Sequence, residues 1–190
     1  MSKEKKVGFF DKCKAIFNCS PRINLEDLFT EGKIRYKSIE VAGKSVEQLK
    51  QELIKNGIRV GSVAEQMMKS PDFTTSEFPK VFNLVILKVG DMGFKYEPTT
   101  AELYKRAEEL GLALCPPQIG PELRLIYTDQ PIGERIYIPT EKLISDSRNK
   151  THTFAIDRYD SQLWLHDRET TLDSSWNRCD SVVFLSVQAA

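Results

Sequence analysis

The chain has 190 residues, of which 41% are hydrophobic and 28% are charged, which is enough to build a core and too apolar for a disordered protein. Its 27 Lys and Arg residues balance its 27 Asp and Glu residues, so no overall charge attracts nucleic acid or an anionic membrane. No run approaches the roughly 20 apolar residues of a membrane span, and the N-terminus lacks the apolar stretch of a signal peptide. We therefore expect a cytoplasmic protein without a membrane span.

The N-terminal segment, residues 1–20, has apolar side chains at helical spacing, with lysines elsewhere. These side chains are Phe9, Phe10, Cys13, Ile16 and Phe17. The pattern favours a helix that packs on the body of the protein, and a helix for a membrane surface or partner is the alternative. Residues 24–29 are then typical of a helical turn, and residues 33–43 alternate as in a strand.

Residues 45–70 predict two short helices, each opened by a capping box, at Ser45 with Gln48 and at Ser62 with Glu65. A tight connection would join them. Two such helices could form a DNA-binding helix-turn-helix, but the second has few side chains that read bases. Packing is therefore the favoured role of both helices, and DNA binding through residues 45–70 is an alternative function.

A polar segment at residues 72–80 is the best candidate for a domain boundary. It divides the chain into a helical N-terminal region, 1–75, and an α+β domain, 76–190. The apolar run in 81–94 predicts a strand that is covered on both faces, and a capping box at Thr99 opens a helix that Gly111 ends. Further strand-like segments are 123–127, 134–139, 152–157, 161–167 and 181–187. The predicted fold class is α+β, a small helical N-terminal part followed by an antiparallel β-sheet with one packed helix.

The segment GLALCPPQIGPELRLIY, residues 111–127, places Cys115 between that helix and a predicted strand. A catalytic cysteine is normally activated by a helix N-terminus or a nearby base, whereas Cys115 follows a helix C-terminus. Its leucine neighbours favour a buried thiol. The prolines after it predict a rigid, extended connector that could line a pocket, and its strand would pair with 134–139 as a hairpin.

A second hairpin, residues 152–167, has its predicted turn at Tyr159-Asp160, which places apolar residues on one face. In this register His152 lies opposite Asp167, and a His–Asp pair can act as a general base. Trp164 and His166 fall on the other face. Ordinary cross-strand pairing is the favoured interpretation, and a metal-independent hydrolase site is the alternative.

Asp129, Glu134 and Arg135 gather at the predicted tip of the first hairpin, as a binding loop or as turn residues. The sequence contains no nucleotide-binding, zinc-protease or serine-hydrolase motif. This removes the common classes of enzyme as first choices and leaves open whether the protein is an enzyme.

The chain from about residue 60 to its end resembles a family of uncharacterised bacterial proteins. The resemblance rests on LVILKVGDMGF, on TAELYKRAEELGLALCPPQIGPELRLIYTDQPIGE, and on the later WLHDRE and SSWNRCDSVVFL. The family has no known activity, so the resemblance implies only that this part of the chain behaves as one unit.

The function expected first is that of a non-catalytic binding or interaction protein of the bacterial cytoplasm, with a protein or small molecule as its partner. Nucleic acid is a less favoured partner, and no metal or cofactor is expected. The candidate binding residues are Cys115, Arg124, Asp129, Glu134, Arg135 and Trp164. The alternative is a small hydrolase, such as a metal-independent nuclease, with His152, His166 and Asp167 as catalytic residues.

Overall fold

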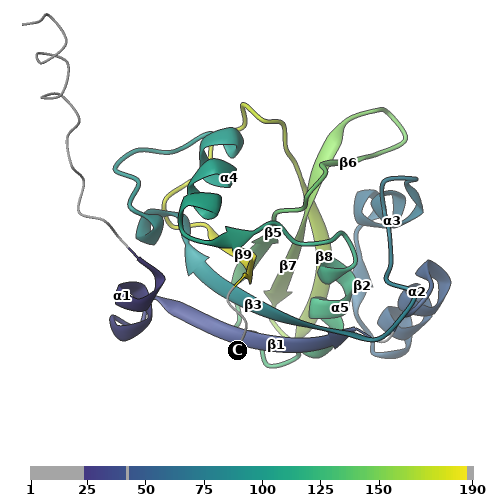
Figure 1. Cartoon of the computed structure of the whole chain (residues 1–190). Helices are drawn as coiled ribbons and strands as arrows, with labels where there is room; N and C mark the ends of the chain where they lie inside the picture. Colours follow the sequence, from purple (N-terminus) through teal and green to yellow (C-terminus); the bar gives the residue numbers. More distant parts are fainter. Residues whose placement is uncertain (1–23, 42, 188–190) are drawn as a thin grey trace, which may run out of the picture.

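One sheet with helices on both of its faces forms the body of the protein (Figure 1). The computed structural model describes residues 24–41 and 43–187, and the helix predicted within residues 1–20 lies outside this part. In chain order the elements are α1 (Leu25–Thr30), β1 (Ile34–Val41), α2 (Val46–Lys55), β2 (Arg59–Val60), α3 (Ser62–Lys69), β3 (Lys80–Lys88), the 3-10 helix η2 (Val89–Met92), α4 (Thr100–Glu109), β4 (Leu112–Ala113), α5 (Ile119–Ile126), β5 (Arg135–Ile138), β6 (Ile144–Ser145), β7 (Thr151–Tyr159), β8 (Gln162–Glu169) and β9 (Ser181–Ser186).

The strands of the sheet lie in the order β1-β3-β9-β5-β7-β8-β2, with β4 beside β9 and β6 beside β7. Most neighbours are antiparallel, but β5 with β9 and β2 with β8 are parallel. The predicted α+β class is therefore confirmed in its coarse form, while the expectation of an antiparallel sheet is wrong. The sheet is mixed because the last strand, β9, returns to its centre and runs in the same direction as β5.

Strands from both sides of the predicted boundary at residue 75 belong to this sheet. All eight residues of β1 pair with β3, and β2 pairs with β8. The division into two regions stays a prediction, but the region before residue 75 contributes strands as well as helices.

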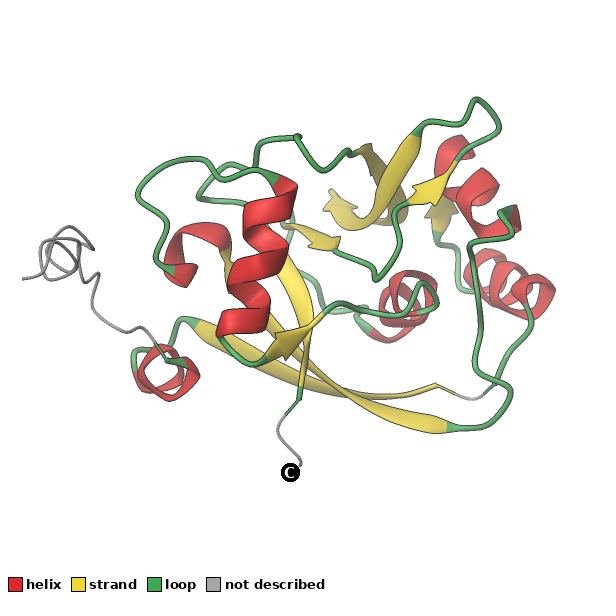
Figure 2. Ribbon diagram, turned by 45° about the horizontal axis from the view of Figure 1, so that its top comes forward, coloured by secondary structure: helices red, strands yellow, loops and turns green. Residues whose placement is uncertain are grey.

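The two faces of the sheet are covered by different helices (Figure 2). On β3, Leu84 and Ile86 pack with side chains of α2, α3 and α5. The alternate residues Val85 and Leu87 pack with side chains of α1 and α4. Successive side chains of a strand point to opposite faces, so the apolar run of β3 is buried on both sides, as predicted.

Two of the three predicted capping boxes are present, at Ser45 before α2 and at Thr99 before α4. The third is wrong, because Ser62 is the first residue of α3 and Gly61 precedes it without a side-chain hydrogen bond. The carboxylate of Glu65 instead binds two lysines. The connection between α2 and α3 includes strand β2, so the two helices are not joined by a simple tight turn.

Residues 123–127, predicted as a strand, lie in and directly after helix α5, so the hairpin expected with 134–139 is wrong. Ile119, Leu123 and Tyr127 are buried and recur every four residues, which is a helical period. Pro121 lies in the first turn of α5, where the missing N–H group breaks no helical hydrogen bond. Two helices, α4 and α5, therefore pack on the sheet from the segment in which one was expected.

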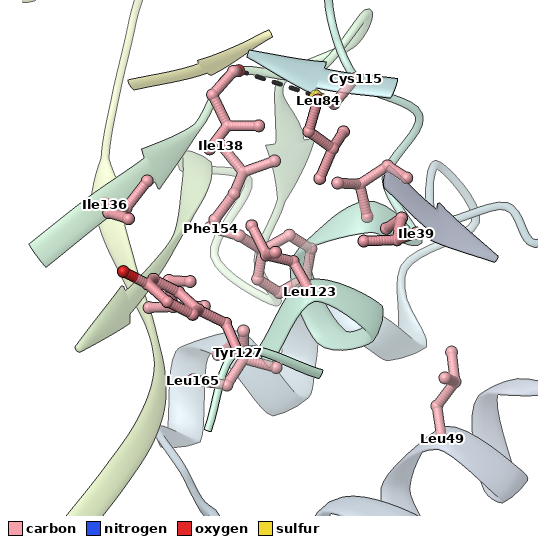
Figure 3. Packing of buried hydrophobic residues seen from close by; sticks show 14 of the residues in the cluster. Ile39, Leu49, Leu84, Cys115, Leu123, Tyr127, Ile136, Ile138, Phe154 and Leu165 are labelled. Carbon is pink, nitrogen blue, oxygen red and sulfur yellow. Dashed lines mark hydrogen bonds between the residues drawn. The ribbon is translucent and has the colours of Figure 1, made fainter. Parts of the chain in front are cut away.

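Gly120 allows α5 to lie directly on β7. A Cβ atom at this position would lie 2.8 Å from the ring of Phe154, closer than packed carbon atoms can approach. Leu123 and Phe154 lie side by side in the same core (Figure 3). The Gly-Pro step that suggested a connector is thus a close-packed helix start.

Strands β7 and β8 form the second predicted hairpin, but the turn lies one residue later, with Asp160 in a left-handed conformation (φ 50°). As a result His152 lies opposite Glu169 instead of Asp167. This is a shift of two residues along β8, which leaves every side chain on its predicted face. His152 and Asp167 therefore remain diagonal neighbours on one face.

Candidate functional site

Three polar side chains meet near the starts of strands β1 and β5, in a group that we call the open cluster: Arg35, Tyr127 and Glu134. The guanidinium of Arg35 donates to Glu134 Oε1 at 2.6 Å and to the Tyr127 hydroxyl at 2.8 Å. That hydroxyl donates to Glu134 Oε2 at 3.0 Å. The three groups thus close a ring of charge-assisted hydrogen bonds, which fixes both the cation and the carboxylate.

Each member of the open cluster comes from a different element. Arg35 lies on the edge strand β1, Tyr127 ends α5, and Glu134 immediately precedes β5. Burial raises the pKa of the Tyr127 hydroxyl, and its hydrogen bond to Glu134 raises it further. The phenol therefore stays protonated at neutral pH and serves as a hydrogen-bond donor.

A buried guanidinium supports the open cluster from behind. Arg124 is fully buried and donates to the backbone oxygen of Tyr127, to the side chain of Gln130 and, at 3.2 Å, to the backbone oxygen of Asp157. Gln130 in turn donates to the backbone oxygen of Glu134 at 3.0 Å. Burial lowers the pKa of Arg124 to about 10, so it remains charged at neutral pH. Arg124 thus positions two of the three members.

The open cluster borders a hollow of about 490 Å³. Three cationic side chains (Lys33, Arg35, Lys88), two carboxylates (Asp91, Glu134) and Ser181 form its polar lining. Within residues 24–41 and 43–187, Lys88 forms no ion pair. Lys33 pairs with Glu31 and Arg35 pairs with Glu134, so among the described residues Lys88 and Asp91 are the charged groups of the lining that form no ion pair.

A second polar group, the closed cluster, consists of Asp146, His152 and Asp167. The Nδ1 atom of His152 lies 2.9 Å from Asp167 Oδ2, and its Nε2 atom lies 3.4 Å from Asp146 Oδ2. The predicted contact between His152 and Asp167 is therefore present. However, the side chain of His152 is only 2% exposed, so a substrate has no access to the imidazole.

Asp146 anchors the closed cluster from the turn between β6 and β7. It accepts hydrogen bonds from the backbone N–H groups of Arg148 and Lys150 and from the Arg148 guanidinium, at 2.8 to 3.0 Å. Burial by itself favours the neutral acid, but these hydrogen bonds outweigh it and hold the pKa of Asp146 well below its usual range. The arrangement is that of a self-contained structural ion group.

Trp164 and His166, on the other face of the hairpin, stack on each other with ring centroids 4.7 Å apart. Arg59 of β2 lies over the Trp164 ring at 5.3 Å. The indole is thus already in contact with two side chains of the protein and is only partly exposed, which makes it a poor platform for stacking a nucleobase. His166 and His152 lie on opposite faces of the hairpin, so the structure does not bring the predicted catalytic histidines together.

Of the remaining predicted binding residues, Arg135 makes two hydrogen bonds to the buried Asp157, at 2.6 and 3.2 Å. The side chain of Asp129 is exposed and forms no hydrogen bond with the part of the chain that the structure describes. Cys115 is fully buried, with its Sγ atom 3.6 Å from the backbone oxygen of Val183 (Figure 3). Burial raises the pKa of this thiol far above its usual range, so it stays protonated and unreactive.

The structure thus joins two of the predicted residues, Arg124 and Glu134, in one network, and sequence reasoning missed Arg35, Tyr127 and Gln130. Arg35 is 99 residues from Glu134 in the chain, and nothing in the local pattern of β1 indicates that they meet. The apolar context of Tyr127 suggested a core strand. Within the described segments, no group of three or more His, Cys, Asp or Glu side chains is arranged so that it could hold a metal ion.

Comparisons with models of protein families, with curated proteins and with solved structures found no match to this chain. The resemblance to uncharacterised bacterial proteins therefore stays a prediction. In the segments that the structure describes, every helix is too short or too polar to cross a membrane.

Proposed function

We propose that the protein is a non-catalytic binding protein, and that the hollow beside the open cluster holds a small ligand with a carboxylate or phosphate group. The observation that carries this proposal is that the same hollow is lined by Lys88, which forms no ion pair with the described part of the chain, and by the fixed guanidinium of Arg35. Two cationic residues in the lining of a hollow of about 490 Å³ suit one anionic group.

The open cluster also places a hydrogen-bond acceptor, the carboxylate of Glu134, in the lining of the hollow. Glu134 is held in place by Arg35 and Tyr127 and lines the same hollow. A carboxylate accepts hydrogen bonds only, so it favours a ligand that carries a hydroxyl or amino group beside its anion. The preferred ligand class is thus a small hydroxy or amino acid, or its phosphate counterpart.

Binding of inorganic phosphate and of acetate, measured by titration calorimetry and NMR, tests this function. We expect dissociation constants near the millimolar range, which correspond to a binding free energy of about 4 kcal/mol. Added salt should weaken the binding. Resonances of Lys88 and Ser181 should shift. Lys88→Gln should weaken binding at least about fivefold, a loss of about 1 kcal/mol in binding free energy. Lys105→Gln, at an exposed position on α4, should not change binding.

The proposal fails if neither anion binds, or if Lys105→Gln weakens binding as much as Lys88→Gln. Equal weakening would mean that the anions respond to overall charge and not to the hollow.

The other two functions stay predictions with less support. The hydrolase rests on the contact between His152 and Asp167, which is buried. DNA binding through residues 45–70 is not favoured either, because Lys50 of α2 and Lys69 of α3 both pair with Glu65.

A further inference from the structure

A second hollow, of about 660 Å³, lies where α1, β1 and the end of α4 meet. Its lining includes Phe29 and Tyr36, whose rings contact each other with centroids 5.5 Å apart. Both are unusually exposed for aromatic residues, at 56% and 50%. Its lining also includes the carboxylates of Glu26 and Glu109. Glu109 also forms an ion pair with Arg106 at 3.0 Å, so the lining is aromatic and carries a small negative charge, chiefly from Glu26.

The chain itself contains a segment of matching chemistry. Residues 9–17 carry the apolar side chains at helical spacing, among lysines. Residues 1–23 hold six of the 27 basic residues and only two of the 27 acidic ones, so the rest of the chain is acidic on balance. The segment and the hollow are therefore complementary in both charge and apolar character.

The connection between them is short. Asn24 lines the hollow, and seven residue steps separate it from Phe17, which span at most about 25 Å. Tethering at this length gives a high effective concentration, roughly millimolar, so that even a weak contact is occupied.

We propose that residues 9–17 bind in this hollow, with Phe10, Cys13 or Phe17 against the rings of Phe29 and Tyr36 and with lysines near Glu26 and Glu109. The hollow is then an intramolecular docking site. A second copy of the chain and an anionic membrane surface are the competing partners of the segment.

Disulfide trapping in the full chain tests this proposal. Cys19→Ser and Cys179→Ser leave Cys13 as the reactive thiol, because Cys115 is buried. Glu109→Cys then adds a thiol at the hollow, and Glu47→Cys adds one on α2, at the far end of the molecule (Figures 1 and 2). Under mild oxidation we expect an intramolecular disulfide at least about tenfold faster with Glu109→Cys.

Two further variants separate docking from chance encounter. Phe29→Ser should slow the trapping several-fold, whereas Phe78→Ser, at an exposed aromatic outside the hollow, should leave it unchanged. Melting temperatures identify any variant that is unfolded. Amide hydrogen exchange of α1, compared between the chain with and without residues 1–23, tests docking without any substitution.

Three outcomes would overturn the proposal: equal trapping rates at the two positions, disulfide-linked dimers in place of the intramolecular product, or exchange in α1 that is indifferent to residues 1–23. Dimers would assign the hollow to a second copy. Equal rates together with binding of the chain to vesicles of phosphatidylserine would assign the segment to a membrane surface.

Discussion

The open and the closed cluster use the same kinds of side chain for different purposes. In the closed cluster, Asp146 and His152 are buried, and their partners all come from the same hairpin region. In the open cluster, Arg35 is 46% exposed and its partners come from distant parts of the chain. Local polar residues thus stabilise a turn, whereas residues from three elements build a site that faces a hollow.

The difference shows that a suggestive pair of residue types is not itself a site. His152 with Asp167 has the geometry of a general base, but no substrate can approach it. Arg35 with Glu134 resembles an ordinary surface ion pair, but a buried layer behind it and a hollow beside it make it the stronger candidate. Access of a ligand to the side chains, and the buried hydrogen bonds behind them, distinguish the two clusters more clearly than the residue types do.

The largest effect is expected from Arg124→Ala, which removes the layer behind the open cluster. It leaves the oxygens of Tyr127, Gln130 and Asp157 without their donor in a buried space. We expect the free energy of unfolding to fall by about 3 kcal/mol or more, with loss of anion binding, as measured by urea denaturation and calorimetry. Arg178→Ala, at an exposed position, is the control, and an equal loss in both variants would contradict the supporting role.

A smaller effect, which depends on pH, is expected from Asp146→Asn in the closed cluster. The folded-state pKa of Asp146 is depressed, so its ionised form stabilises the protein above the unfolded pKa of about 3.9. That stability is lost as the pH falls below this value through the folded-state pKa. The facing charged groups are Arg148 and His152.

We therefore expect wild-type protein to be more stable than Asp146→Asn at pH 5 to 7, with the difference shrinking below about pH 4. Denaturation at a series of pH values measures it. Asp129→Asn, at an exposed carboxylate, should show no such difference. A constant gap down to pH 2 would mean that the carboxylate acts through its shape and not through its charge.

The smallest effect on stability is expected from Glu134→Gln in the open cluster. Its ion pair with Arg35 is partly exposed and contributes at most about 1 kcal/mol. The substitution should nevertheless change ligand preference, because it replaces a pure acceptor with a group that also donates. Calorimetry should show amino-acid probes weakened several-fold and phosphate bound at least as well. A large fall in stability with unchanged preference would make Glu134 a structural residue.

Sequence reasoning succeeded where the governing contacts are local. The capping boxes at Ser45 and Thr99, the doubly buried strand β3 and the neighbourhood of His152 and Asp167 all depend on residues close together in the chain. It failed for α5, because Gly120-Pro121 looks like a break unless the ring of Phe154 beneath it is known.

The open cluster could not be predicted for the same reason. Arg35 joins it because β1 pairs with β3, and β9 returns to lie between β3 and β5. This arrangement of strands brings Arg35 of β1 within hydrogen-bond distance of Glu134, the residue before β5. Arg124 and Glu134 were named as single candidates from their chemistry, and their role in binding stays a prediction. Their partners follow from topology, which local patterns do not contain.

The most direct test of the central claim is a crystal structure of the protein soaked in selenate, a phosphate-like anion that scatters anomalously. We predict an anomalous peak in the hollow, within hydrogen-bond reach of Lys88 and the Arg35 guanidinium. An empty hollow, or a peak only at other basic residues, would contradict the assignment of this region as the binding site.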